Sequence, residues 1–270
     1  MNLSNLINTI AAQDGSFYDR TDSRRNAMRS IASVGGKLAL TALPLALGSL
    51  FQKAYGQTNA DITAVLNYAL TLEYLEAEFY TKGDASGVVP VGTAAVKAIQ
   101  TIRDHENAHV AFLTTVIKSM NATPVDKPSF DFTAGGAFAD VFSNYDTFLA
   151  VAQTFEDTGV RAYKGRAGEL ISNNTVLTAA LQIHSVEARH ASHIRQMRWA
   201  RGANAKPWIT GNDTGGIGSA VQASYAGEEN TDQASIKITD FVGTNAATEA
   251  FDEPLTADQV LAIVRPFIKS

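Results

Sequence analysis

The chain has 270 residues, of which 45% are hydrophobic and 18% are charged, so it can bury a sizeable core and is not expected to be disordered. Its net charge of −5 argues against a nucleic-acid-binding surface, and we expect no nucleic-acid partner. The absence of cysteine excludes disulfides, thiolate metal sites and cysteine nucleophiles.

The N-terminal segment, residues 1–57, has the residue order of a secretory signal. Two adjacent arginines, Arg24 and Arg25, precede an uncharged apolar run at Leu38–Phe51, and small residues follow at Ala54–Gly56. The arginine pair resembles a twin-arginine signal. We therefore expect a signal peptide, and a protein that is exported to the periplasm.

This segment departs from a typical twin-arginine signal at one position and is short for a membrane span. Met28 stands where such signals prefer phenylalanine. The uncharged run has 14 residues, whereas a spanning helix needs about 20, so no stable membrane span is expected after processing. The competing interpretation is an ordinary buried or amphipathic N-terminal helix.

Two helices are predicted between residues 58 and 120. Asn59 or Asp61 can cap the first helix, and glycines with a proline predict a loop at Gly83–Gly92. The second helix then runs to about Met120. Apolar residues recur at three-to-four spacing in both, which is typical of helices with one buried face: Ile62, Val65, Leu66, Ala69, Leu72, Phe79, Ile99, Ile102, Leu113 and Ile117.

Two further helices are predicted at 144–170 and 173–201, the latter capped by Asn173 or Asn174. The intervening stretch, 121–143, contains two prolines and a glycine pair, so no long helix is expected there. About 23 residues are enough to run the length of a bundle. This connection is typical of a crossover that joins two helix pairs in one bundle.

A pattern of glutamate, tyrosine and histidine occurs twice in these four helices. Each tyrosine follows the first glutamate by seven residues, or about 700° around a helix, so the two share a face. A Glu-x-x-His pair follows on the next helix. The first copy is Glu73, Tyr80, Glu106 and His109, and the second is Glu156, Tyr163, Glu187 and His190. The repeat indicates an internal duplication.

Inward-facing carboxylates are costly to bury unless they are paired or bind a metal. Four carboxylates and two imidazoles at one point make the ligand set of a two-metal site in a four-helix bundle. This mixed set suits iron or manganese, so two such ions are the expected cofactors. We expect the first glutamate of each copy to bridge the ions and each Glu-x-x-His to supply a terminal pair. The competing interpretation is a fortuitous or vestigial cluster.

Residues 60–200 resemble the ferritin-like superfamily, which includes bacterioferritin, rubrerythrin and manganese catalase. The stretches Leu72–Tyr80 and Phe155–Gly159 are most similar to bacterial ferritin-like-domain proteins of the desiccation-related type. The resemblance implies an all-α, ferritin-like four-helix bundle with a long crossover between helices 2 and 3. It also implies dioxygen or peroxide chemistry at a di-iron or di-manganese centre, with these metal ligands: Glu73, Glu106, His109, Glu156, Glu187 and His190.

Several neighbours of the repeated pattern could also take part. Glu76 competes with Glu73 because it lies one helical turn away, but Gly159 stands at the equivalent place in the second copy, which favours Glu73. Tyr80 and Tyr163 are candidate catalytic residues that hydrogen-bond the glutamates or relay an electron. Plain aromatic core residues are the alternative for both.

The remaining polar residues near the pattern are assigned lesser roles. Arg103 and His184 stand three residues before their glutamates and either orient the ligands or lie on the surface. His193 could be a third imidazole, although a partly buried histidine without that role is favoured. His105 is expected to be exposed and Asp157 to lie off the site.

The C-terminal part, residues 203–270, is irregular and rich in glycine at its start. A short helix or strand is predicted at 219–225, a short strand at 235–239, and a final helix at 257–265 preceded by a capping box at Thr256. No separate catalytic motif is visible. We expect this extension to pack on the bundle as a cover or to form a subunit contact.

The chain is therefore expected to have three parts: an export segment at 1–57, a bundle at 58–202 and an extension at 203–270. The favoured function is an oxidoreductase, either a di-iron oxidase or a di-manganese catalase-like enzyme. Its small-molecule substrates would be dioxygen, peroxide or ferrous iron, and it could form a homo-oligomer. The alternatives are a structural or stress-protective bundle with a vestigial site and, less favoured, an iron-storage shell.

Overall fold

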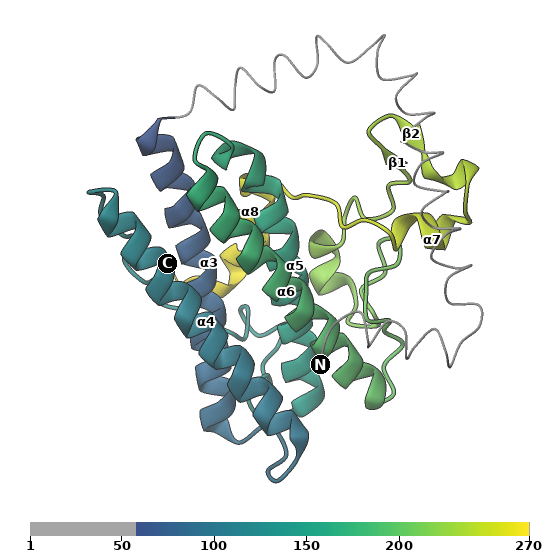
Figure 1. Cartoon of the computed structure of the whole chain (residues 1–270). Helices are drawn as coiled ribbons and strands as arrows, with labels where there is room; N and C mark the ends of the chain where they lie inside the picture. Colours follow the sequence, from purple (N-terminus) through teal and green to yellow (C-terminus); the bar gives the residue numbers. More distant parts are fainter. Residues whose placement is uncertain (1–57, 270) are drawn as a thin grey trace, which may run out of the picture. The chain divides into compact units, whose positions relative to one another are not determined.

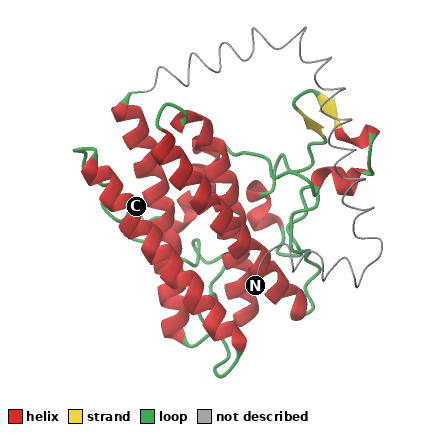
Figure 2. Ribbon diagram, in the orientation of Figure 1, coloured by secondary structure: helices red, strands yellow, loops and turns green. Residues whose placement is uncertain are grey.

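The computed structural model describes residues 58–269, so the predicted export signal at 1–57 lies outside the described residues. Four long helices form the bundle (Figures 1 and 2): α3 Asn59–Ser86, α4 Ala94–Ser119, α5 Tyr145–Ala167 and α6 Asn174–Ala200. Helix α3 packs along α4, and α5 packs along α6. The predicted all-α bundle is confirmed. No helix within residues 58–269 is long and apolar enough to cross a membrane.

Helix α3 begins and ends at residues other than those predicted. Thr58 is the N-cap: its hydroxyl accepts from the Asp61 amide, and the Asp61 carboxylate accepts from the Thr58 amide. The helix continues past Gly83 to Gly87, which adopts a left-handed φ of 70°. Gly83 is helical because its missing Cβ leaves room for the Phe148 ring, so the predicted loop starts four residues too early.

Helix α5 is the most deeply buried element of the bundle. It is capped by Asn144, and every residue from Val151 to Tyr163 is buried. A surface helix would show one apolar stripe, whereas α5 also buries polar residues such as Asp157 and Arg161, which contact the C-terminal extension. This helix therefore lies between the bundle and the C-terminal extension. It continues as a 3-10 turn, η1 Gly168–Leu170.

The crossover at 120–144 contributes to the core. Phe130, Phe132, Phe138 and Val141 are buried there. The backbone also pairs with the end of the chain: the Asp131 amide donates to the Phe267 carbonyl at 2.8 Å. The connection between the two helix pairs is thus held by apolar packing and by the C-terminal segment.

The extension consists of short elements: η2 Ser219–Ser224, β1 Asp232–Gln233, β2 Ile236–Lys237, η3 Ile238–Asp240, α7 Thr244–Thr248, α8 Ala257–Val264 and η4 Arg265–Phe267. The capping box of α8 at Thr256 is present as predicted. The strand predicted at 235–239 is only two residues long, because Ala234 and Ser235 turn the chain with positive φ angles. The segment predicted at 219–225 is a 3-10 helix.

Buried charges join the extension to α5. The Arg161 guanidinium pairs with Glu228 at 2.7 Å and donates to the carbonyls of Ser224, Ala226 and Glu253. Both side chains of this pair are almost completely buried. A buried ion pair is costly to break because each partner would be left unpaired. The extension is therefore fixed against the face of α5 that points away from the repeated glutamates.

Candidate metal centre

The structure brings the six residues of the repeated pattern to one place inside the bundle. Each of the four helices supplies a glutamate, and α4 and α6 each add a histidine: Glu73, Glu106, His109, Glu156, Glu187 and His190. All four glutamates are 0% exposed. Because residues three apart on a helix share a face, the two Glu-x-x-His pairs both point inward. Their role as ligands stays a prediction.

His109 faces three carboxylates in one half of the centre. Its Nδ1 lies 3.1 Å from Glu73 Oε2, 3.2 Å from Glu106 Oε2 and 3.3 Å from Glu187 Oε1. One donor atom from each of these four residues lies within 4.8 Å of the others. Four oxygen and nitrogen donors this close together could surround one metal ion.

His190 occupies the corresponding position in the other half. Its Nδ1 lies 2.9 Å from Glu106 Oε1 and 3.3 Å from Glu156 Oε2. Neither approach has the geometry of a hydrogen bond. The buried atoms His190 Nδ1, Glu106 Oε1 and Glu156 Oε2 therefore lack a hydrogen-bond partner within the described chain. Such groups are normally satisfied in native proteins.

Two carboxylates are shared by both halves. Glu106 and Glu187 belong to each of the two donor groups, whereas Glu73 and Glu156 belong to one each. This differs from the sequence interpretation, which placed the bridging carboxylates on Glu73 and Glu156. The reason is that Glu106 and Glu187 each stand between the two histidines, a relation that depends on how α4 faces α6 and that periodicity along one helix does not contain.

Each tyrosine of the pattern hydrogen-bonds the glutamate of the other half. Tyr80 donates to Glu156 Oε1 at 2.5 Å, and Tyr163 donates to Glu73 Oε1. The glutamate precedes the tyrosine on both α3 and α5, yet each tyrosine reaches the glutamate of the other helix, so these helices run antiparallel around an approximate twofold axis. The hydroxyls leave the second oxygen of each glutamate directed at the centre, which is how outer partners orient metal ligands.

Burial and mutual repulsion shift the pKa values of these groups. Burial raises the pKa of Glu73 to about 7, although its hydrogen bond to His109 opposes the shift. Burial likewise raises the pKa of Glu187 to about 8. Burial would lower the pKa of His109, but the adjacent carboxylates of Glu106, Glu187 and Glu73 outweigh it and raise the pKa to about 12. The side chains thus hold protons that bound cations would displace.

The donor set fits a pair of divalent cations. Within residues 58–269, every ion pair of the four glutamates is to His109 or His190. Two imidazolium charges cannot balance four buried carboxylates, and both oxygens of Glu187 lack any hydrogen-bond partner in this part of the chain. Carboxylate and imidazole donors suit iron or manganese. The cluster could therefore hold metal ions.

Glu76 is a fifth buried carboxylate that the sequence interpretation set aside. Its side chain points toward the centre, because a Cβ at Gly159 would lie 3.4 Å from both Glu76 Oε1 and Glu187 Oε2. Burial first, and then repulsion by Glu187 and the other glutamates, raise the pKa of Glu76 well above its ordinary value. It is absent from both donor groups. The sequence did carry one indication that Glu76 faces the centre, namely its position one helical turn after Glu73.

The other residues weighed from the sequence lie outside the donor groups. Arg103 pairs with Asp84 and Asp104, and His184 Nδ1 contacts the Val160 carbonyl. His193 is exposed and does not join the centre. Asp157 lies off the site as expected, in a buried pair with Arg195 and a hydrogen bond from Tyr225. Arg103, His184 and Asp157 thus make contacts within the fold around the centre.

His105 contacts the centre although it is exposed. Its Nδ1 lies 3.0 Å from His190 Nε2, and the two rings stack with centroids 5.2 Å apart. A partner on the outer nitrogen of a metal-binding histidine fixes the ring's orientation and tautomer. Spacing along α4 does not reveal this contact, because it joins α4 to α6.

Comparison with known proteins agrees with the geometry. The family model described as a ferritin-like domain matches residues 61–199, from the first turn of α3 to the last turn of α6. The match includes all six residues of the proposed ligand set and covers more than half of the chain. No curated protein matches the chain.

Proposed function

Because the chain belongs to the ferritin-like domain family, we propose that it binds two iron or manganese ions and uses them for oxidation by dioxygen or for disposal of peroxide. The six proposed ligands are those of the two donor groups. The centre would make the protein an oxidoreductase rather than a structural bundle. The N-terminal residues 1–57 would direct its export to the periplasm.

One observation carries this proposal. Four carboxylates from four helices are fully buried together, several of their oxygens have no hydrogen-bond partner within residues 58–269, and the nearest cations are two histidines. A folded protein keeps such a cluster at a high cost in solvation unless a ligand compensates it. Hard oxygen and imidazole donors favour iron and manganese over softer metals.

The residues of the chain would divide the work as follows. When bound, the metal ions would supply redox chemistry toward dioxygen or peroxide and would polarise the oxygen species. Glu106 and Glu187 would hold both ions, and Glu73 and Glu156 one each. Tyr80 and Tyr163 would fix the terminal carboxylates through their hydroxyls. The close packing of α5 would exclude bulk water from the centre.

Elemental analysis of natively purified protein tests the metal. We expect two equivalents of iron or manganese per chain in the wild type and loss of both in Glu106→Ala, because Glu106 belongs to both donor groups. Asp104→Ala is the matched control: this residue is exposed on the same helix and should retain two equivalents. A wild type that takes up no iron or manganese, with native helical content, would contradict the proposal.

The two chemistries are separated by activity assays on the loaded protein. Evolution of dioxygen from hydrogen peroxide indicates catalase-like disposal of peroxide, whereas consumption of dioxygen with ferrous iron indicates an oxidase. Both activities should disappear in Glu106→Ala and persist in Asp104→Ala. A protein that binds two metal ions but has neither activity would favour the stress-protective alternative.

Export is tested separately by identifying the mature N-terminus. The proposal expects exported protein to begin at or near Gln57, after the small residues Ala54–Gly56. Exported protein that keeps Met1 would contradict cleavage, and protein that stays in the cytoplasm would contradict export. Neither result bears on the metal centre.

A further inference from the structure

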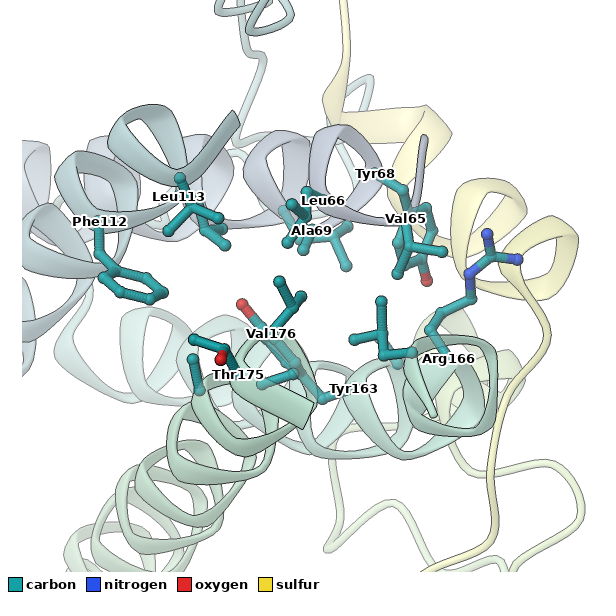
Figure 3. A pocket seen from close by; sticks show the side chains of 16 residues that line it. Val65, Leu66, Tyr68, Ala69, Phe112, Leu113, Tyr163, Arg166, Thr175 and Val176 are labelled. Atoms are coloured by element: carbon teal, nitrogen blue, oxygen red, sulfur yellow. The ribbon is translucent and has the colours of Figure 1, made fainter. Parts of the chain in front are cut away.

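An apolar pocket lies inside the bundle, and residues from all four helices, α3 to α6, line it. It has a volume of about 110 Å³, and almost all of the surface that lines it is apolar. Figure 3 shows Leu66 and Ala69 of α3 on one side and Val176 of α6 facing them across the cavity. A cavity with such a lining stays dry and accepts apolar molecules.

One end of the pocket lies at the surface of the bundle. Phe112 of α4 and Thr175 of α6 lie towards this end in Figure 3, and both residues are exposed. Leu113 and Val176 stand next to them in the sequence, and these two lining residues are buried. The pocket is therefore an apolar entrance that leads from the surface, between α4 and α6, into the bundle.

The pocket adjoins the proposed metal centre. Ala69, in its lining, precedes the proposed ligand Glu73 by four residues on α3. Leu113 follows the proposed ligand His109 by four residues on α4, and four residues of helix rise about 6 Å. Tyr163 also lines the pocket, and its hydroxyl donates to Glu73, so the pocket and the centre share this side chain. The pocket thus lies about one helical turn from the half of the centre that contains His109.

We propose that this pocket admits dioxygen and passes it to the half of the centre that contains His109. This role rests on the proposed function and narrows it, because that function left dioxygen and peroxide as alternatives. Dioxygen is small and apolar, and it forms no strong hydrogen bonds that entry into the pocket would break. Hydrogen peroxide has two hydroxyls, whose hydrogen bonds to water an apolar lining cannot replace. The pocket therefore favours an oxidase that uses dioxygen over an enzyme that disposes of peroxide.

Nuclear magnetic resonance of the chelated, full-length protein measures contact with dioxygen in the absence of metal. Dissolved dioxygen is paramagnetic, so it speeds the relaxation of the methyl groups that it contacts. We expect the methyl groups of Val65, Leu113 and Val176, which line the pocket, to relax several-fold faster under dioxygen pressure. The buried Val151 and Val264 lie outside the lining and should respond several-fold less. An equal response of all five residues would overturn the proposal.

Xenon is a second probe of the pocket, because it binds dry apolar cavities. Crystals of the full-length protein under xenon pressure should show an anomalous peak between Leu66 of α3 and Val176 of α6. Ordered water in the pocket, with no xenon peak there, would overturn the proposal because a wet pocket does not favour dioxygen over peroxide.

Substitutions that fill the pocket test whether dioxygen travels through it. Ala179→Leu on α6 and Val116→Phe on α4 add carbon atoms to its lining. Both variants should keep two metal equivalents, but the ferrous-loaded protein should react with dioxygen about tenfold more slowly, an added barrier of about 1.4 kcal/mol. The rate with added hydrogen peroxide should not change, which shows that the centre itself is intact.

Ala200→Leu is the matched control, because this residue is exposed on α6 and lies outside the lining. It should react with dioxygen as the wild type does. An unchanged dioxygen rate in Ala179→Leu and Val116→Phe would overturn the proposed route, and so would an equal loss of rate with peroxide. Where a filled variant fails to fold, the relaxation and xenon measurements on the wild type still decide.

Failure of this proposal is distinguishable from failure of the metal proposal. Faster relaxation of the pocket methyl groups in a protein that takes up no iron or manganese would support a gas site but contradict the centre, and with it the delivery of dioxygen. Two metal equivalents without preferential relaxation in the pocket would leave the centre intact and overturn the dioxygen route alone. Two metal equivalents with release of dioxygen from peroxide as the sole activity would also overturn that route.

Discussion

Glu73 and Glu76 lie one turn apart on α3 and both are buried, but their surroundings differ. Glu73 accepts from Tyr163 and contacts His109, and it belongs to one donor group. Glu76 belongs to neither group, and its pKa is raised by burial and by the neighbouring carboxylates. The duplicated pattern distinguishes the two in the same way, since Gly159 replaces a carboxylate in the second copy.

Amide substitution separates the roles of these two glutamates. Glu76→Gln should retain two metal equivalents and should make the metal-free protein lose less stability as the pH rises, because an amide does not ionise whereas burial and the other carboxylates oppose ionisation of Glu76. Glu73→Gln should lose one equivalent. Elemental analysis and denaturant unfolding measure both effects. Loss of metal in Glu76→Gln, with full retention in Glu73→Gln, would show that the assignment is reversed.

Metal binding should release protons, and its affinity should rise with pH. The folded-state pKa values of Glu73 and Glu187 are about 7 and 8, above the ordinary value of 4.5. Metal ions need deprotonated ligands, so affinity should increase between pH 6 and pH 8, about tenfold per pH unit for each proton released. Calorimetry in buffers of different ionisation enthalpy measures the protons. Affinity that is independent of pH would contradict this prediction.

The metal-free protein should show the opposite dependence. A carboxyl whose pKa is raised on folding stabilises the fold fully below its unfolded pKa, and this stability is lost as the pH rises through the folded value. For Glu73 and Glu187 that window extends from about 4.5 to about 8. Denaturant unfolding of chelated protein should therefore give a lower free energy of unfolding at pH 8 than at pH 5.

Spacing along single helices was enough to predict the six clustered residues, because a Glu-x-x-His pair and a Glu-x6-Tyr pair each fix one helical face. Spacing was not enough to predict which carboxylates belong to both donor groups. That depends on the rotation of α4 relative to α6, which places Glu106 and Glu187 between the histidines. The contact of His105 with His190 was missed for the same reason.

At the scale of elements, Gly83 shows how one residue can support two opposite interpretations. Glycine next to a charged residue is typical of a loop, yet here it lies inside α3 where the Phe148 ring of α5 approaches the backbone. Glycine is present at this position because α3 and α5 approach closely. That contact between helices cannot be inferred from the residue pattern of α3 alone. Helix interiors were predictable from periodicity, whereas this boundary required knowledge of the partner helix.

Gly83→Ala should lower the free energy of unfolding by about 1–3 kcal/mol, the usual cost of overpacking a core. A Cβ at this position would lie 2.2 Å from Phe148 Cε2, and the ring is buried on all sides. Gly168→Ala is the control: it has nothing within 4 Å and a helical φ of −61°, so its stability should stay the same or rise slightly. Equal stability of the two variants, measured by denaturant unfolding, would contradict the packing argument.

At the scale of the molecule, the extension is the part that the sequence specified least. Its short elements have little periodicity, and the predicted strand proved to be a two-residue hairpin arm. What fixes it is a set of buried polar contacts on α5, among them Arg161 with Glu228 and Asp157 with Tyr225. Polar residues on a helix predict exposure by default, so their burial against a later segment could not be inferred. The division at residues 58 and 202 stays a prediction.

Arg161→Met should release the extension from the bundle. It leaves Glu228 buried without its cation and three carbonyls without a donor, a loss of about 3–5 kcal/mol. Limited proteolysis should then cut within residues 203–256 while α3 to α6 remain intact. Arg189→Met, an exposed change on α6, should be cut at the wild-type rate. Identical digestion of both variants would contradict the conclusion that Arg161 fixes the extension to α5.

Anomalous diffraction from crystals of natively purified, full-length protein tests the central claim most directly. Data collected at the iron and manganese absorption edges should show two peaks inside the bundle, one beside His109 and one beside His190, with Glu106 and Glu187 between them. A bundle with these side chains arranged as described, and no anomalous peak among them after supply of both metals, would contradict the account.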